Sequence, residues 1–198
     1  MYSDKSATYM NVYILLAHPD KDSFNGRLAD ACEQEARRKG HVVRRQNLGD
    51  LQFDPILHKG YVEGQAWEPD LQLAWQNICW SQQWIIIYPV WWGSVPALLK
   101  GFLDRVLLPG KAFHYHDKDP FWDKLLKGRS ARLITTCDAP ALWLWWQYRN
   151  SDLHTMKDAV LKFCGFSPVR SVRIGRMKYL TEAQRIKMLA QVSRKMVS

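Results

Sequence analysis

Apolar residues gather in five short runs along the chain, and segments with a helical period lie between them. The runs at residues 12–17 and 84–88 are unbroken, which is typical of strands buried on both faces of a sheet. The predicted strands cover residues 12–17, 41–46, 84–88, 131–136 and 168–174. Because strands and helices alternate, we expect one doubly wound, five-stranded parallel α/β sheet with helices on both faces and right-handed crossovers.

Helices are predicted where apolar residues recur every three or four positions. They cover residues 24–40, 71–81, 96–108, 153–165 and a final segment from 181 onward. A basic turn and a glycine end the first helix, and Thr181 with Glu182 begins the last, in agreement with capping preferences. Segments without a regular period are predicted to be loops, at residues 47–70, 109–127 and 137–151.

Length and composition predict a single domain over residues 1–198. Of these residues 47% are hydrophobic, enough for one sizeable core, and no change of composition divides the chain. Residues 1–10 are polar and are predicted to be a flexible N-terminal extension. Because they lack the apolar core of a signal peptide and no apolar run is long enough to span a bilayer, we expect a cytoplasmic protein.

The four cysteines are widely spaced and form no Cys-x-x-Cys pair. They also do not cluster with histidines at the spacing of metal ligands. We therefore expect reduced, mostly buried thiols and no bound metal.

The formal net charge of +9 raises the question of an anionic partner. The basic residues form two dense patches, which are Arg37, Arg38, Lys39, Arg44 and Arg45, and then Arg170, Arg173, Arg176 and Lys178. Both patches flank predicted strands, so the first interpretation is a solvated rim. A basic surface would also attract an anionic dinucleotide or an acidic partner protein. No zinc finger, basic zipper or RNA-binding aromatic signature is present, so we expect no nucleic-acid binding.

The loop after the first strand is a candidate anion site. Ser23 and Asn25 stand at the start of a helix, where free backbone N–H groups and the helix dipole favour a negative charge, although ordinary capping explains them equally well. His18 precedes them in the same loop. No Gly-x-Gly-x-x-Gly follows the strand, so the usual dinucleotide fingerprint is absent. Trp91 and Trp92 follow the central strand, at the sheet edge where ligands bind, and suit a flat ligand.

Four motifs in register carry a family resemblance. They are Leu-Ala-His-Pro-x-x-x-Ser-Phe-Asn, then Pro-x-x-Trp with Pro-Ala-x-Leu-Lys-Gly-Phe-x-Asp-Arg, then Thr-Thr after the fourth strand, then Phe-Cys-Gly-Phe. Together they resemble the NAD(P)H:quinone oxidoreductase (DT-diaphorase-like) family of flavodoxin-like flavoproteins. The resemblance implies a flavodoxin-like fold, a homodimer, FAD or alternatively FMN as cofactor, NAD(P)H as co-substrate, and two-electron hydride transfer to a quinone or similar flat acceptor.

The resemblance also implies site residues. Those implied for flavin binding are His18, Ser23, Phe24, Asn25, Pro89, Val90, Trp91, Trp92, Gly93, Thr135, Thr136 and Asp138, and those implied for the substrate pocket are Phe113, Tyr115, Trp143 and Trp146. The family commonly has Gln at the position of Trp91 and a glycine pair at that of Cys137 and Asp138. No acid/base residue for hydride transfer is carried over. The similarity in residues 18–25 favours FAD over FMN.

Backbone N–H groups of residues 91–94 and 135–138 are expected to stabilise the charge left on a reduced flavin. Asp138 would oppose that charge, so we expect it to cap its loop or turn outward. The tryptophans of residues 143–146 form a pocket wall, or else a core or a dimer interface.

Three alternatives remain open. The first is a nitro- or azo-reductase. The second is a regulatory flavin-binding subunit that associates peripherally with a membrane transporter. The third is a flavin-free signalling domain, which the sequence disfavours because no acidic pocket follows the first strand.

Overall fold

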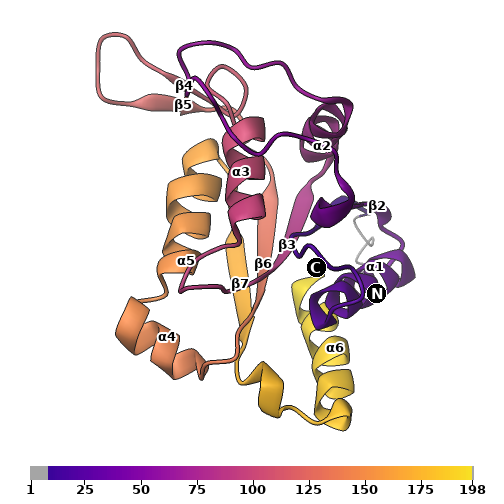
Figure 1. Cartoon of the computed structure of the whole chain (residues 1–198). Coiled ribbons are helices and arrows are strands. Elements are labelled where there is room, and N and C mark those ends of the chain that lie inside the picture. Colours follow the sequence, from indigo (N-terminus) through magenta and orange to yellow (C-terminus); the bar gives the residue numbers. More distant parts are fainter. Residues whose placement is uncertain (1–8, 198) are drawn as a thin grey trace, which may run out of the picture.

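The structure is a computed structural model that describes residues 9–197, so the predicted N-terminal extension lies almost wholly outside the described residues. Its centre is a five-stranded parallel sheet in the order β2-β1-β3-β6-β7 (Figure 1). The strands are β1 (Asn11–Leu16), β2 (Val42–Asn47), β3 (Gln83–Pro89), β6 (Ser130–Thr136) and β7 (Val169–Ile174). The predicted doubly wound α/β fold is confirmed, and each strand lies within two residues of its predicted bounds.

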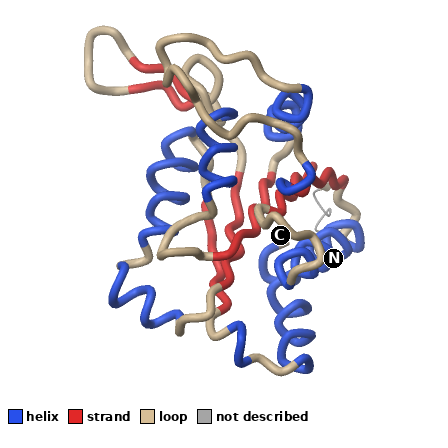
Figure 2. The backbone as a smooth tube through the Cα atoms, in the orientation of Figure 1, coloured by secondary structure: helices blue, strands red, loops and turns tan. Residues whose placement is uncertain are grey.

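Helices cover both faces of the sheet (Figure 2). One face carries α1 (Phe24–Arg38) and α6 (Glu182–Met196), and the other carries α2 (Pro69–Trp80), α3 (Ala97–Val106), α5 (Ser151–His154) and the π-helical segment η2 (Thr155–Lys162). Strand side chains alternate between these layers, as the two-residue period of a strand requires. On β1, Tyr13 and Leu15 join one core while Ile14 and Leu16 join the other.

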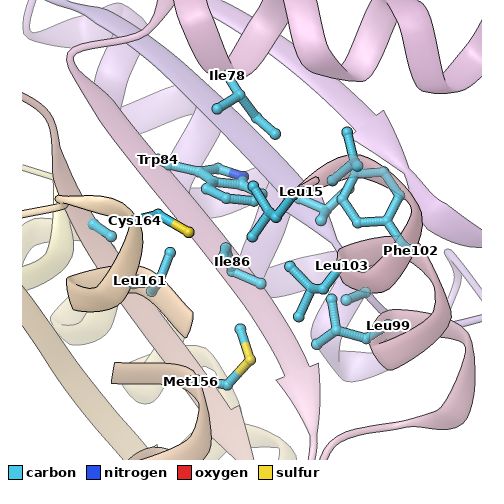
Figure 3. Close-up of a cluster of buried hydrophobic side chains, with 14 of the residues drawn as sticks. Leu15, Ile78, Trp84, Ile86, Leu99, Phe102, Leu103, Met156, Leu161 and Cys164 are labelled. Carbon is cyan, nitrogen blue, oxygen red and sulfur yellow. The ribbon is translucent and has the colours of Figure 1, made fainter. Parts of the chain in front are cut away.

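The larger core contains Trp84, near the start of β3 (Figure 3). Its indole stacks on Tyr13 of β1, with ring centroids 5.8 Å apart and planes inclined by 14°. Phe102 of α3 and Met156 of η2 pack around it. These side chains are fully buried and explain why the predicted central strand has almost no polar position.

A buried arginine fixes the irregular segment between β2 and α2, whose only regular turn is η1 (Leu48–Asp50). Arg105 of α3 is completely buried and donates to the carbonyl oxygens of Asp54 and Ala66 and to the carboxylate of Glu68. Trp67 Nε1 donates back to the Arg105 carbonyl oxygen at 2.7 Å. The segment from Asp54 to Glu68 is therefore held against α3.

Two segments that the sequence predicts as loops are regular in the structure. Residues 109–127 contain a β-hairpin of β4 (Phe113–Tyr115) and β5 (Trp122–Lys124), and residues 137–151 contain helix α4 (Ala141–Tyr148). The hairpin has only three residues per strand, too few for a period to be visible. Helix α4 has Pro140 before its first turn and three tryptophans within it, so neither spacing nor propensity marks it as a helix.

The two ends of the described chain meet on the outer layer. Helix α1 packs against α6, and Arg27 of α1 pairs with Glu182 of α6. Lys39 Nζ donates to the carbonyl oxygen of Val197 at 2.7 Å, and Val197 shares a core with Val12. The first basic patch lies beside this pairing, and ion pairs satisfy much of it, since Glu33, Glu35 and Asp30 accept from its arginines.

Candidate functional site

A cavity of about 290 Å³ opens at the carboxyl ends of β1, β3 and β6. It lies where the strand order reverses between β1 and β3, the point at which doubly wound sheets bind ligands. Its lining residues are His18, Ser23, Phe24, Asn25, Pro89, Val90, Trp91, Thr136, Cys137, Asp138, Met177, Lys178 and Arg185. The structure thus brings together most of the residues that the sequence suggests for cofactor binding. Trp92, Gly93 and Thr135 are not among them.

The loop after β1 presents an anion-binding helix terminus. Ser23 is the N-cap of α1, because its Oγ accepts from the Gly26 N–H at 3.3 Å and donates to the Asp20 carbonyl oxygen at 2.7 Å. The N–H groups of Phe24 and Asn25 precede the first intrahelical bond and carry the positive end of the helix dipole. Ser23 therefore has the capping role, and the backbone beside it can receive an anion.

His18 stands at the same edge with one ring nitrogen engaged. Its Nδ1 lies 2.9 Å from the carbonyl oxygen and 3.0 Å from the amide nitrogen of Asp20, so Asp20 orients the ring. The ring also meets the Trp91 indole edge to face, with centroids 5.7 Å apart. The second nitrogen, Nε2, is left for a ligand in the cavity.

A side-chain hydrogen bond joins the first loop to the third. Thr136 Oγ1 at the end of β6 donates to Asn25 Oδ1 on α1 at 2.9 Å, and both residues are buried. This bond closes the floor of the cavity between β1 and β6. It fixes the Asn25 amide, so the N–H₂ group of that side chain remains for a ligand.

Basic side chains form a wall that the sequence did not assign to the site. Lys178 and Arg185 line the cavity, and Arg185 donates from Nη2 to the Met177 carbonyl oxygen at 3.2 Å. Its Nε is buried and has no hydrogen-bond partner among residues 9–197. Asp138 carries the opposite charge. Its Oδ1 accepts from the Lys178 N–H at 3.1 Å, so it ties its loop to the loop after β7.

A tight turn carries the two exposed indoles. The Trp91 N–H donates to the Ser94 carbonyl oxygen at 3.0 Å, and the Ser94 N–H donates back to Trp91 at 2.9 Å. Trp92 and Gly93 both have positive φ, 52° and 70°, as a type I′ turn requires. For a residue as bulky as Trp this backbone conformation is strained, and the Trp92 side chain is fully exposed.

Several of the backbone N–H groups predicted to face a flavin are engaged elsewhere in the structure. The N–H groups of Trp91 and Ser94 are consumed within the turn, and that of Cys137 donates to the Ile174 carbonyl oxygen at 3.0 Å. Of the predicted donors, those of Trp92, Gly93 and Asp138 remain for a ligand. The donor set is therefore smaller than the sequence suggested.

Thr135 belongs to a buried polar network beneath the cavity. Its Oγ1 accepts from Arg173 Nε at 3.1 Å, and Arg173 also donates to Asn150 Oδ1 at 2.7 Å and to the carboxylate of Asp152. Tyr88 donates to the same carboxylate at 3.3 Å, and burial raises the pKa of its hydroxyl well above the ordinary value. The prediction that Arg173 lies on a solvated rim is wrong, and Thr135 supports the site from below without lining it.

The four residues suggested for a substrate pocket do not share a pocket within one chain. Phe113 and Tyr115 line a separate cavity of about 340 Å³ between α3, the hairpin and η2. Trp146 lines another hollow near His154, and Trp143 contacts Trp146 with ring centroids 5.5 Å apart. A pocket that contains all four side chains would need a second copy of the chain, so the substrate pocket stays a prediction.

The candidate metal ligands and the cysteines of the described residues lie apart from one another. No group of three or more His, Cys, Asp or Glu side chains within residues 9–197 is arranged to hold a metal ion. The cysteines are free, Cys79 is exposed and the other three are buried. Burial raises the pKa of the Cys137 thiol at the cavity wall, so it is not poised as a nucleophile. Across the same residues, no helix combines the length and the apolarity needed to cross a bilayer.

Comparisons with known proteins agree with this geometry. The sequence model of the family described as flavodoxin-like fold matches residues 10–196. The chain is similar to ribosyldihydronicotinamide dehydrogenase (quinone) of Pongo abelii, with 31% identity over 78% of this chain and 77% of that protein. It is 26% identical to NAD(P)H dehydrogenase (quinone) 1 of Rattus norvegicus over 77% of this chain and 64% of that protein, so it spans less than two thirds of that relative.

A solved structure extends the similarity to three dimensions. The crystal structure of Smu.1420 from Streptococcus mutans UA159 has a TM-score of 0.80 to this chain at 27% identity. The match covers 95% of this chain and 99% of the other. Nearly the whole chain therefore shares one architecture with that protein.

Proposed function

The chain belongs to the flavodoxin-like fold family, and on this premise we propose that it is a flavin-dependent NAD(P)H:quinone oxidoreductase. The observation that carries the proposal is the single cavity at the β1/β3 switch point, which gathers three loops from distant parts of the sequence. The names of its relatives support the same activity, since they are quinone dehydrogenases.

The cavity residues fit a flavin. The start of α1, with His18, Lys178 and Arg185 around it, provides donors and positive charge for a phosphate. The Trp91 indole and the exposed turn beside it provide a flat apolar wall for a ring system. Arg185 Nε, a buried donor with no partner in the described chain, is satisfied if an anionic group binds there.

We favour FMN over the FAD that the sequence suggested. FAD would need contacts for its adenine half as well. The irregular segment of residues 55–70 is packed against α3 through Arg105, and none of its residues lines the cavity. The volume of about 290 Å³ is at the lower end of the range for cofactor pockets. A mononucleotide therefore matches the cavity better than a dinucleotide.

A bound flavin supplies two-electron exchange between a nicotinamide and a quinone. The chain would bind the phosphate end at the start of α1, orient the ring against Trp91, and offer the N–H group of Asp138, which lines the cavity, to the charge that reduction creates. The Asp138 carboxylate at the cavity wall is held by the Lys178 N–H. The remaining ring face is left open for NAD(P)H and then for the acceptor.

A second copy of the chain would complete the acceptor pocket. Phe113 and Tyr115 belong to a hairpin that projects from the sheet, and Tyr115 is half exposed. Trp143 and Trp146 are exposed on α4 at the other end of the molecule. We therefore keep the homodimer as part of the proposal, and a cytoplasmic location stays a prediction from the sequence.

The decisive experiment is an absorbance spectrum of the purified protein before and after anaerobic NADPH, followed by release and identification of the flavin. We expect flavin bands that bleach without a semiquinone, that return when a quinone is added, and that belong to FMN. A panel of quinone, nitro and azo acceptors compared by kcat/KM then separates the acceptor classes. A colourless protein that binds neither flavin on reconstitution contradicts the proposal.

A further inference from the structure

Two turns with a left-handed backbone touch each other at the edge of the cavity. The first is the tight turn of residues 91–94, in which Trp92 has a φ of 52°. The second is the junction of α4 and α5, where Arg149 and Asn150 have φ values of 48° and 54°. Elsewhere in the described part of the chain, Arg176 is the only non-glycine residue with positive φ. Such a backbone costs free energy and persists only where its surroundings hold it, often at functional sites.

A hydrogen bond and a ring contact join the tight turn to the α4–α5 junction. Ser151 Oγ donates to the Gly93 carbonyl oxygen at 2.6 Å. A Cβ atom added at Gly93 would lie 3.3 Å from Cδ1 of Tyr148, so the Tyr148 ring covers this glycine. Since Trp91 of the same turn lines the cavity, the junction supports one wall of the cavity from outside.

The junction is held from inside the molecule by Arg173 of β7. The Asn150 side chain makes no cap bond to α5, and its Oδ1 accepts from Arg173 Nη1 at 2.7 Å. The same guanidinium donates to the carboxylate of Asp152 and, through Nε, to Thr135 Oγ1 at 3.1 Å. Arginine presents its donors in a rigid planar fork, so these three acceptors are fixed relative to one another. Because Thr136, the next residue of β6, lines the cavity, one side chain ties the end of β6 to the junction.

We propose that Arg173 is a positioning residue that sets the cavity wall formed by the tight turn. It acts on the turn in two steps. The bonds of Arg173 to Asn150 and Asp152 fix the junction, and the bond from Ser151 then fixes the turn. A buried ion pair adds little net stability compared with apolar packing, and the pair with Asp152 would need only one arm of the fork. The bonds to Asn150 and Thr135 use the rest of the fork to hold two further elements.

The consequence for the reaction rests on the proposed function. Trp91 is the wall against which the proposed flavin ring is oriented, so a loosened turn should weaken the binding of the nicotinamide and of the acceptor. It should affect the hydride exchange less, because the flavin supplies that chemistry. The action of Arg173 on the turn is a property of the flavin-free chain and can be tested without a bound cofactor.

Hydrogen–deuterium exchange of the flavin-free full chain, measured by mass spectrometry, tests the two steps. In the parent chain the N–H groups of Trp91 and Ser94 are bonded within the turn and should exchange slowly. Ser151→Ala should raise exchange in the turn about five- to tenfold through the loss of one hydrogen bond, and Ser151→Thr, which keeps the hydroxyl, should restore it. Arg173→Lys should raise exchange in the turn and in the junction, because lysine keeps the charge but has no fork. Asn150→Gly should do the same, since glycine keeps the positive φ and removes only the acceptor.

Ser130→Ala and Arg170→Lys are the matched controls. The Ser130 hydroxyl also donates to a carbonyl oxygen, that of Gln82 at 3.3 Å, but at the start of β6, away from the cavity. Arg170 is an exposed arginine on the same strand as Arg173. Neither control should change exchange in the turn. Thermal denaturation of every variant verifies that it is folded, and Ser151 is exposed, so its replacement leaves the core intact.

With flavin bound, Ser151→Ala should raise the KM for NADPH and for the quinone about fivefold, and should raise KM more than it lowers kcat. Unchanged exchange in the turn of Ser151→Ala, or an equal rise in Ser130→Ala, overturns the link between the turn and the junction. Unchanged exchange in the turn of Arg173→Lys and Asn150→Gly overturns the role of Arg173. Failure of the proposed function is a separate outcome, since a chain that binds no flavin still gives the exchange result.

Discussion

The buried network beneath the cavity predicts a large penalty for Asp152→Asn. Asp152 is 1% exposed and the side chain of Arg173 is 7% exposed, so the substitution leaves a guanidinium buried without its counter-charge. Removing one partner of a buried ion pair costs about 3 to 5 kcal/mol. At about 2 to 4 °C per kcal/mol for a domain of this size, even the lower value lowers the Tm by about 6 to 12 °C.

The exposed pair of Lys100 and Asp104 provides the control. It has a comparable geometry, with a nitrogen–oxygen distance of 2.7 Å, but both side chains are in contact with water. Asp104→Asn should therefore cost about 0.5 kcal/mol, or about 1 to 2 °C. Differential scanning calorimetry of both variants makes the comparison. The reasoning is refuted if Asp152→Asn lowers the Tm no further than Asp104→Asn.

Three further outcomes are expected. Asn25→Ala and Thr136→Val each break the bond across the cavity floor, so flavin affinity measured by fluorescence titration should fall about tenfold for either variant. The double variant should lose no more than a single one, and additive losses would show that the bond is not the cause. Trp92→Asn should raise the free energy of unfolding, measured by denaturant titration, by about 1 kcal/mol, because Asn tolerates the positive φ better than Trp. A loss of stability would mean that the Trp92 indole is packed in solution. The hydrogen bond from Arg38 holds the pKa of Glu35 below its ordinary value of 4.5, so the stabilisation of the fold by the Glu35 carboxylate is complete above pH 4.5 and is lost as the pH falls further. Glu35→Gln should therefore flatten the fall in Tm in that acidic range and leave the slope of Tm against pH unchanged near neutrality.

The sheet was predictable because its signal is local. The central strands are apolar runs, and the run around Trp84 has no polar residue because both of its faces are covered. The order of loops at the sheet edge then follows from the rule that ligands bind at the carboxyl ends of parallel strands. For this reason His18, Asn25, Trp91 and Thr136 meet around one cavity, as the sequence suggested.

What the sequence missed depends on contacts between distant residues. Arg185 reaches the cavity from α6, and nothing in its neighbourhood distinguishes it from other helical arginines. Arg173 belonged to a cluster of basic residues that usually lies in solvent, but its partner Asp152 is 21 residues earlier and was hidden in a segment predicted as loop and helix start. Helix α4 escaped detection because its apolar side chains point outward, so its pattern matched no buried face.

Because α1 packs against α6, the outer helical layer cannot be completed until the end of synthesis. Chain leaves the ribosome at about 5 to 20 residues per second, so α1 is available for many seconds before residues 182–196 exist. Throughout that interval the side of α1 that faces α6 is uncovered, Arg27 lacks its partner Glu182, and Lys39 lacks the carbonyl oxygen of Val197. A nascent chain that pauses in this interval exposes apolar strands. A chaperone would therefore matter most after β7 has been synthesised and before α6 is complete.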